Sequence, residues 1–333
     1  KPQLSLHKHV GINLRKMKSI QLIGDLIHVD SNESFVLDKQ YTLRKATKRE
    51  LSFITSDIQE SFGNDIFNKN FNPYLNEFDS NKEIKELDFD RHKCWVIERK
   101  NGRHGAFDLD FLGLSKLNLT VLCCYVYDDE IEEKFIEDSV TKIYSSHYTF
   151  TVFYSNLKHL GYPTKNISTN DVDDIKRTLD IVGNFKKVKS KNPIVAKAFE
   201  DFKKLTEIPE SSPFKILSYF SILELILTTN NEKTSITHQL ATKIMLINKR
   251  LQEEICISKF FKVNPNIDTL IKRLYELRSQ IAHGSFSSFE TFKIETKYPF
   301  KQAIPDFIYE ELLTKIIIQS LIEPELIEDL RKC

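Results

Sequence analysis

The chain has 333 residues, enough for two domains that each bury a core of their own. Its 48 lysines and arginines are balanced by 47 aspartates and glutamates, and the formal charge of +1 excludes a protein that attracts nucleic acid through a global field. The five cysteines include no Cys-x-x-Cys pair, the longest apolar runs fall short of the roughly 20 residues of a membrane span, and no signal peptide is visible. We therefore expect a soluble, cytoplasmic protein with reduced thiols and no membrane contact, in which any RNA binding is local.

The first half of the chain is dominated by strand patterns. Between residues 19 and 29 apolar and polar residues alternate, and the run at 35–37 that follows indicates either a hairpin with this segment or two separate short strands. Asn101-Gly102 is a hairpin signal that joins two predicted strands, 93–99 and 106–109. Two further strands are predicted at 119–127 and 147–154.

Three helices are predicted in the same half. Thr47-Lys48-Arg49-Glu50 matches a capping box, in which the threonine and the glutamate satisfy each other's backbone N–H groups, so a helix should run from 48 to 61. An acidic run after the strand at 119–127 opens a second helix over 128–145. Apolar residues at helical spacing predict a third helix over 172–182, which Gly183 ends.

One group of residues in this half has the outline of a metal-dependent nuclease core. Such a core holds Mg²⁺ on two carboxylates at a strand end and steadies the phosphate with a lysine, and Asp90, Glu98 and Lys100 occur in that order. Because Glu98 and Lys100 adjoin a hairpin turn, where charged residues are common, we interpret them as surface residues. Asp108 and Asp110 are interpreted as turn residues, and no metal site is predicted.

The basic, apolar-poor segment 184–192 is interpreted as the boundary between an α+β domain, 1–185, and an all-helical domain, 190–333. A helix over 213–229 is apolar on nearly all sides and is predicted to form the centre of the second domain. Within it, Glu224 either belongs to a narrow solvent-facing stripe or pairs with Arg278 of a later helix. The other helices predicted in this domain are 193–207, 236–254, 266–283 and a long last helix that follows a loop at 285–303 and is kinked or restarted at Pro324.

The helix over 266–283 carries a cation where its pattern demands an apolar side chain. Arg278 lies four residues after Leu274 and seven after Ile271, so at about 100° per residue it falls in the middle of the apolar face. Burying a guanidinium without a partner would cost several kcal/mol. At Arg278 the face must therefore meet a phosphate, a carboxylate, a wet cleft or another subunit.

A histidine follows near the end of the same helix. Gly284 is the residue expected just past a helix C-terminus, so the helix should end at His283, and a terminus lets the imidazole swing back toward Arg278. An imidazole is the side chain best suited to exchange protons near neutral pH. Arg278 and His283 are therefore the candidate functional residues.

The pattern Arg278-x4-His283, with Leu277 before it and Gly284 after it, resembles the Arg-x(4 to 6)-His signature of the HEPN superfamily. The sequence Leu-Arg-Ser-Gln-Ile-Ala-His-Gly at 277–284 and the helices before it resemble in particular the Apea-like HEPN proteins of bacterial defence systems. Many HEPN ribonucleases carry Asn, Asp or His directly after the arginine, where this chain has Ser279. The resemblance implies that the second domain is a HEPN-like helical bundle and that it forms a homodimer with two such motifs in one cleft.

The chemistry that the resemblance implies is metal-independent cleavage of RNA without a cofactor. The ribose 2′-OH attacks its own phosphate, which leaves a cyclic 2′,3′-phosphate and a free 5′-OH. His283 would be the acid and base, Arg278 would hold the scissile phosphate and stabilise its developing charge, and Ser279 would donate one hydrogen bond to the substrate. DNA lacks the 2′-OH, so the implied substrate is RNA.

The resemblance also implies a biological role. A nuclease of this kind would be a toxin-like effector of anti-phage defence, and the α+β domain would be a sensor or regulator that keeps it silent until a regulatory ligand or phage-derived trigger binds. Ser279 and the balanced charge support an alternative, in which the HEPN-like bundle binds RNA or a protein partner without cleaving it.

Overall fold

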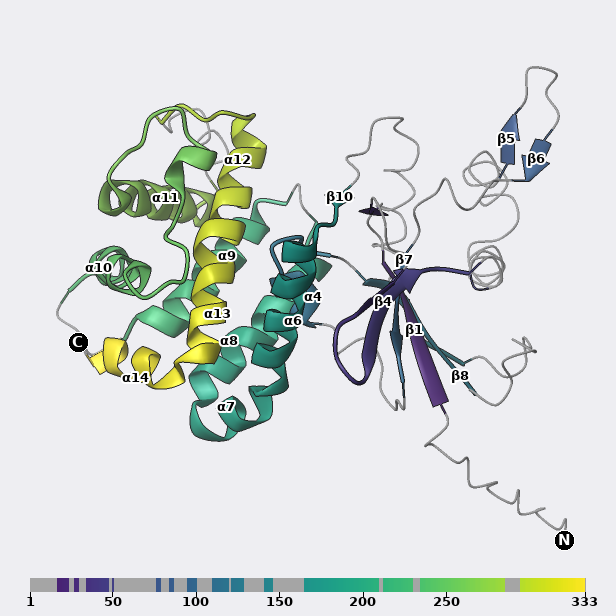
Figure 1. Ribbon diagram of the computed structural model, residues 1–333. Coiled ribbons are helices and arrows are strands. Elements are labelled where there is room, and N and C mark those ends of the chain that lie inside the picture. The colour runs from purple at the N-terminus through teal and green to yellow at the C-terminus, as the bar shows by residue number, and fades with distance from the viewer. Residues whose placement is uncertain are drawn as a thin grey trace, which may run out of the picture. The chain divides into compact units, whose positions relative to one another are not determined.

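The computed structural model divides into two compact units, residues 1–177 and 178–333 (Figure 1). The division falls within α6 (Thr169–Gly183). Among the described residues the first unit combines strands with helix and the second is built of helices and one isolated β-bridge, in agreement with the predicted α+β layout. The described residues are 17–23, 27–29, 34–47, 50, 76–78, 84–86, 95–100, 110–119, 121–128, 141–145, 165–209, 212–229, 234–284 and 294–332.

The first unit contains a six-stranded sheet with the order β3-β4-β7-β1-β8-β9. All pairings in this sheet are antiparallel. Two short pairs lie outside it, parallel β10 with β2 and antiparallel β5 with β6. The strands are β1 (Met17–Ile23), β2 (Ile27–His28), β3 (Ser34–Val36), β4 (Tyr41–Lys45), β5 (Asn76–Phe78), β6 (Ile84–Glu86), β7 (Trp95–Arg99), β8 (Val121–Asp128), β9 (Thr141–Ser145) and β10 (Lys165–Asn166).

Strand β1 is a central strand and not half of a hairpin with the next segment. Its residues 19–23 are all buried, and it pairs with β7 on one side and β8 on the other. The hairpin instead joins β3 and β4, where Asp38 Oδ1 accepts from the backbone N–H groups of Gln40 and Tyr41, each at 2.7 Å. The predicted hairpin between the first two segments is therefore wrong and the alternative of separate strands is correct, because β7 and β8 occupy both edges of β1 and β3 pairs with β4 instead.

Strand β9 corrects the prediction of a helix over 128–145. Residues 141–145 pair antiparallel with β8, with Ser145 opposite Cys123 and Thr141 opposite Val126. The edge of β8 supplies backbone partners that the local acidic pattern does not reveal, and such tertiary pairing overrides local propensity. The predicted strands at 93–99 and 119–127 are confirmed as β7 and β8. Those at 106–109 and 147–154 lie outside the described residues.

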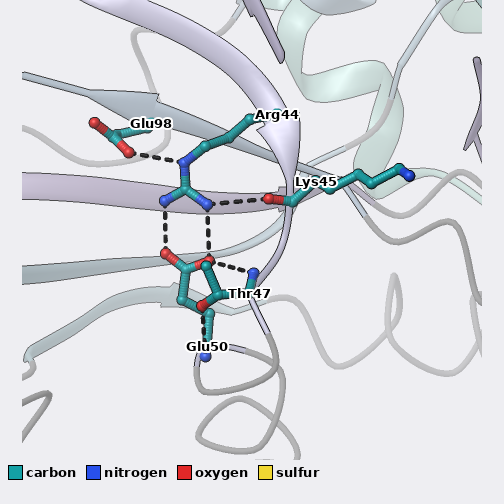
Figure 2. A network of polar contacts seen from close by, with 5 residues as sticks. All are labelled: Arg44, Lys45, Thr47, Glu50 and Glu98. Carbon is teal, nitrogen blue, oxygen red and sulfur yellow. Dashed lines mark hydrogen bonds and ion pairs between the residues drawn. The ribbon is translucent and has the colours of Figure 1, made fainter. Parts of the chain in front are cut away.

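An arginine on β4 holds together three segments of the first unit (Figure 2). Arg44 Nη2 and Nη1 donate to the two carboxylate oxygens of Glu50 at 2.6 and 2.9 Å, and its Nε donates to Glu98 on β7 at 2.8 Å. The Glu50 carboxylate also accepts from the Thr47 N–H at 2.8 Å, while the Glu50 N–H donates to Thr47 Oγ1 at 3.2 Å. The predicted capping box is confirmed, although the helix beyond Glu50 lies outside the described residues.

Burial makes this network a source of stability. The side chains of Glu50, Glu98 and Arg44 are 6%, 13% and 18% exposed. Burial by itself would raise the pKa of Glu50, but the hydrogen bonds and charge of Arg44 outweigh it and hold the pKa below its ordinary value of 4.5. A carboxyl group whose pKa falls on folding stabilises the folded state above that ordinary value, and this contribution is lost as the pH falls below it.

The second unit is a set of packed helices. Residues 185–191, which the sequence assigns to a domain boundary, form a helix in which Val188 is buried. The predicted helix over 236–254 ends at Asn248, whose Oδ1 accepts from the Ile255 N–H at 2.7 Å. The helices are α7 (Phe185–Lys191), α8 (Pro193–Lys203), α9 (Phe214–Leu227), α10 (Ile236–Asn248), α11 (Ile267–Ala282), α12 (Phe300–Asp306), α13 (Lys315–Ile322) and α14 (Pro324–Lys332), with a π-helix, Phe307–Thr314, between α12 and α13.

Helix α9 occupies the centre of the second unit, as its apolar sequence predicts. It packs against α8, α10, α11, α14 and the π-helix (Figure 1). Arg331 of α14 donates from Nη1 to the Leu225 carbonyl oxygen at 2.5 Å and so satisfies a group in the last turn of α9. The buried residues of α9 are Lys215, Ile216, Tyr219, Phe220, Ile222, Leu223, Ile226 and Leu227.

The last long helix starts earlier than predicted, and a break before Pro324 separates it from α14. It begins at Phe300, within the predicted loop, and runs through the π-helix to Ile322. In the π-helix the buried carboxylate of Glu311 accepts from the Cys256 N–H and from Lys315 Nζ, each at 2.7 Å. Pro324 restarts the chain as α14, as predicted. No helix within the described residues has both the length and the apolar character needed to cross a membrane.

We predict that Glu50→Gln lowers the free energy of unfolding by about 2 to 4 kcal/mol at neutral pH, because the amide leaves the buried Arg44 guanidinium short of negative charge. Chemical denaturation measures the change. Asp173→Asn is the matched control, since it converts a carboxylate whose side chain is 73% exposed and should change stability by less than about 0.5 kcal/mol. The difference between wild type and Glu50→Gln should shrink as the pH falls below 4.5. A difference that is independent of pH would contradict the ionic role of Glu50.

Candidate functional site

Helix α11 carries the three residues that the sequence singles out, Arg278, Ser279 and His283. The helix begins after Asn266, whose side-chain oxygen accepts from the Asp268 N–H at 2.9 Å. It ends at Ala282, so the predicted helix over 266–283 is confirmed. Its buried face has the predicted helical spacing and consists of Leu270, Ile271, Leu274, Leu277 and Ile281.

Arg278 lies beside this buried face, not in its middle as predicted, and is paired within its own bundle. Its Nη2 is 3.2 Å from Oε1 of Glu224 on α9, and its guanidinium carbon lies 5.5 Å from the centre of the Tyr275 ring, one turn earlier on α11. The side chains of Arg278 and Glu224 are 25% and 20% exposed, so the pair is neither sealed in the core nor free on the surface. Of the partners that the sequence allows for Arg278, the structure supplies a carboxylate, and Glu224 is that partner.

The contact between Arg278 and Glu224 is an ion pair by distance but lacks hydrogen-bond geometry. Glu224 Oε1 and Arg278 Nε are both buried, and neither has a hydrogen-bond partner among the described residues. A buried polar atom without a partner costs about 1 to 3 kcal/mol and is uncommon in folded proteins. The pair therefore contains one unsatisfied acceptor and one unsatisfied donor on two side chains in contact.

Tyr275 completes this group. Its ring packs edge-on against Phe220 of α9, with the ring centroids 5.7 Å apart. Burial raises the pKa of the Tyr275 phenol above its ordinary value of 10.0, the charge of Glu224 raises it further, and Arg278 acts in the opposite direction. Tyr275 therefore lies within the electrostatic reach of both members of the pair.

His283 caps the C-terminus of α11 and is exposed. Its backbone N–H donates to the Ser279 carbonyl oxygen at 3.1 Å, and the Gly284 N–H donates to Ile281 at 3.0 Å. Gly284 has a φ of +79°, the left-handed conformation expected of a glycine just past a helix end. The predicted end of the helix at His283 is thereby confirmed.

Within one chain the structure does not bring the two candidate residues into one interaction. Arg278 lies in the seam between α9 and α11, His283 lies at the exposed helix end, and no hydrogen bond joins their side chains in the described structure. The sequence left Glu224 as one of two alternatives and gave no role to Tyr275. The available signal was spacing, because Tyr275 lies three residues before Arg278 and therefore on the same side of the helix.

In the alternative metal site of Asp90, Glu98 and Lys100, the glutamate has a structural role. Glu98 is bonded to Arg44 in the network of Figure 2, and Asp90 lies outside the described residues. Asp110 begins the short helix α4 (Asp110–Leu114) and is not a turn residue. Across the described part of the chain, no group of three or more His, Cys, Asp or Glu side chains is arranged to hold a metal ion.

Comparison of the chain with models of protein families, with curated proteins and with solved structures finds no match. The residues of the site therefore provide the argument for function.

We predict that Gly284→Ala lowers the free energy of unfolding of the second unit by about 1 kcal/mol, because an L residue is strained at a φ of +79°. No atom lies within 4 Å of the position that the added Cβ would take, so the cost arises from the backbone alone. Gly183→Ala is the control, since its Cβ also meets no atom within 4 Å and its φ lies outside the strained region. Denaturation of both variants tests the assignment, and equal stabilities would contradict the helix end described at His283.

Proposed function

We propose that the second unit is a HEPN-like helical bundle that cleaves RNA without a metal, and that the protein is a toxin-like effector of bacterial anti-phage defence. The observation that carries the proposal is the location of Arg278 just before the last turn of α11 and of His283 at its C-cap, at the spacing of the HEPN signature. α11 packs on the central apolar helix α9, which gives both residues a rigid support.

The chemistry follows from the two side chains. The exposed imidazole of His283 is accessible to a substrate and can take the proton of the ribose 2′-OH or deliver one to the 5′ leaving oxygen. Arg278 has five N–H donors, and its contact with Glu224 involves Nη2, so a partly exposed guanidinium retains donors for a phosphate. Ser279 would donate one further hydrogen bond. Arg278 would thus bind the scissile phosphate and stabilise the charge that develops on it.

A second copy of the chain completes the site in this proposal. Because one chain holds Arg278 in the seam and His283 at the helix end, a twofold axis near the C-terminus of α11 would surround one phosphodiester with two arginines and two histidines. The first unit would then act as a sensor or regulator that responds to a regulatory ligand or a phage-derived trigger.

One observation favours the alternative of a bundle that binds RNA or a protein without cleaving it. Glu224 neutralises much of the charge of Arg278, and an anion in contact with the guanidinium competes with a phosphate for the same donors. Wild-type protein that binds RNA and leaves it intact would support this alternative.

We predict that wild-type protein cleaves single-stranded RNA in the presence of EDTA and leaves 2′,3′-cyclic phosphate ends. His283→Ala should lower the cleavage rate by about 10² to 10⁴ through loss of the proton-transfer group. Arg278→Ala should lower it by about 10² to 10³ through loss of charge stabilisation on the phosphate. Electrophoresis of end-labelled RNA measures the rate, and mass spectrometry identifies the ends.

Two control variants remove a guanidinium and an imidazole at positions outside the proposed site. Arg273→Ala removes a guanidinium from another position of α11, and His238→Ala removes an exposed imidazole from the first turn of α10. Both should cleave at the wild-type rate. Equal cleavage by the wild type, Arg278→Ala and His283→Ala would exclude the proposed site, and loss of all activity in EDTA would contradict a metal-independent reaction.

A further inference from the structure

The unsatisfied atoms of the Arg278 and Glu224 pair define what a ligand must supply. Arg278 Nε is a buried donor that lacks an acceptor, and Glu224 Oε1 is a buried acceptor that lacks a donor. Oε1 lies 3.2 Å from Nη2 of the same guanidinium, so both needs arise within one small region. A ligand that satisfied both would recover the cost of two incomplete hydrogen bonds.

Simple ligands suit this pair only in part. A phosphodiester has acceptors alone, so it would bind the guanidinium and repel the Glu224 carboxylate. A hydroxyl can donate to the carboxylate and accept from Nε, but it brings no negative charge to the arginine. RNA carries both groups next to each other, because the 2′-OH is on the ribose carbon adjacent to the one that bears the 3′-phosphate.

We propose that Glu224 accepts a hydrogen bond from the ribose 2′-OH while Arg278 binds the adjacent phosphate, which makes Glu224 the residue that distinguishes RNA from DNA. This inference rests on the proposed function, since it places the scissile phosphate at Arg278. It adds no covalent step: Glu224 orients the hydroxyl, and proton transfer stays with His283.

The surroundings of Glu224 suit this task. The Tyr275 ring lies under the guanidinium, with its centre 5.5 Å from the guanidinium carbon, so an aromatic side chain supports the arginine of the pair. The two unsatisfied atoms are shielded in the free protein, but the side chains that carry them are 20% and 25% exposed. The pair is therefore partly accessible to a ligand at the surface of the second unit.

The test compares binding of two labelled single strands, oligouridylate and oligodeoxyuridylate of equal length, which differ only in the 2′-OH. Measurements are made on the full chain with His283→Ala to prevent cleavage. Glu224→Met removes the carboxylate at similar volume and should reduce the preference for the ribose strand by about tenfold, the effect of one hydrogen bond to a charged group. Glu224→Gln keeps a carbonyl acceptor and should retain part of the preference. Glu276→Met removes an exposed carboxylate of α11 and should retain all of it.

The outcomes separate this inference from the proposed function. If Glu224→Met changes the affinity for both strands equally, Glu224 is a structural partner of Arg278 and the inference is overturned. If the unmodified Glu224 background already binds both strands equally, it is overturned as well. Arg278→Ala tests the proposed function independently, because it should weaken binding of both strands, and unchanged binding would reject the phosphate site itself. Thermal melting of each variant shows whether it is folded. If Glu224→Met is poorly folded, the preference of Glu224→Gln for the ribose strand decides, and a preference equal to that of the unmodified Glu224 background overturns the inference.

Discussion

The contact between Arg278 and Glu224, in the seam between α9 and α11, is the interaction that gives the second unit its chemical character. A guanidinium on the inner side of α11 requires a negative partner, and α9 provides one at 3.2 Å. The pair is incomplete, because a donor and an acceptor within it remain unsatisfied. Because the two atoms belong to side chains of opposite charge in contact, the pair has hydrogen-bonding capacity left for a ligand.

The two units use half-buried arginines in different ways. Arg44 in the first unit donates to Glu50 through two nitrogens and to Glu98 through a third, and it joins two strands to a capped turn. Its hydrogen bonds are short and well formed, so its role is stability. Arg278 has one contact that lacks hydrogen-bond geometry and an aromatic ring beneath it, so its guanidinium is held in place with donors still available. Comparison of the two supports the assignment of binding chemistry to Arg278.

Much of the second unit could be predicted from the sequence, because its helices are signalled locally. Asn192 and Ser235 cap helices, Gly284 ends one, and the apolar spacing of α11 is regular over its whole length. The first unit was less predictable, since strand pairing depends on residues far apart in the chain. The helix predicted up to Ser145 failed for this reason: residues 141–145 pair with β8, and their own composition contains no sign of that partner.

For the candidate site, the sequence by itself determined that Arg278 lies next to an apolar helix face and that the helix ends at His283, because both follow from helical periodicity and from glycine at a position of positive φ. Only the tertiary structure decided which group meets the guanidinium. The approach of α9 to α11 selects Glu224 as its partner and brings Tyr275 into the same contact, and no local pattern encodes the distance between two helices. The packing of α9 against α11 therefore places the charge of Arg278 in a defined polar site.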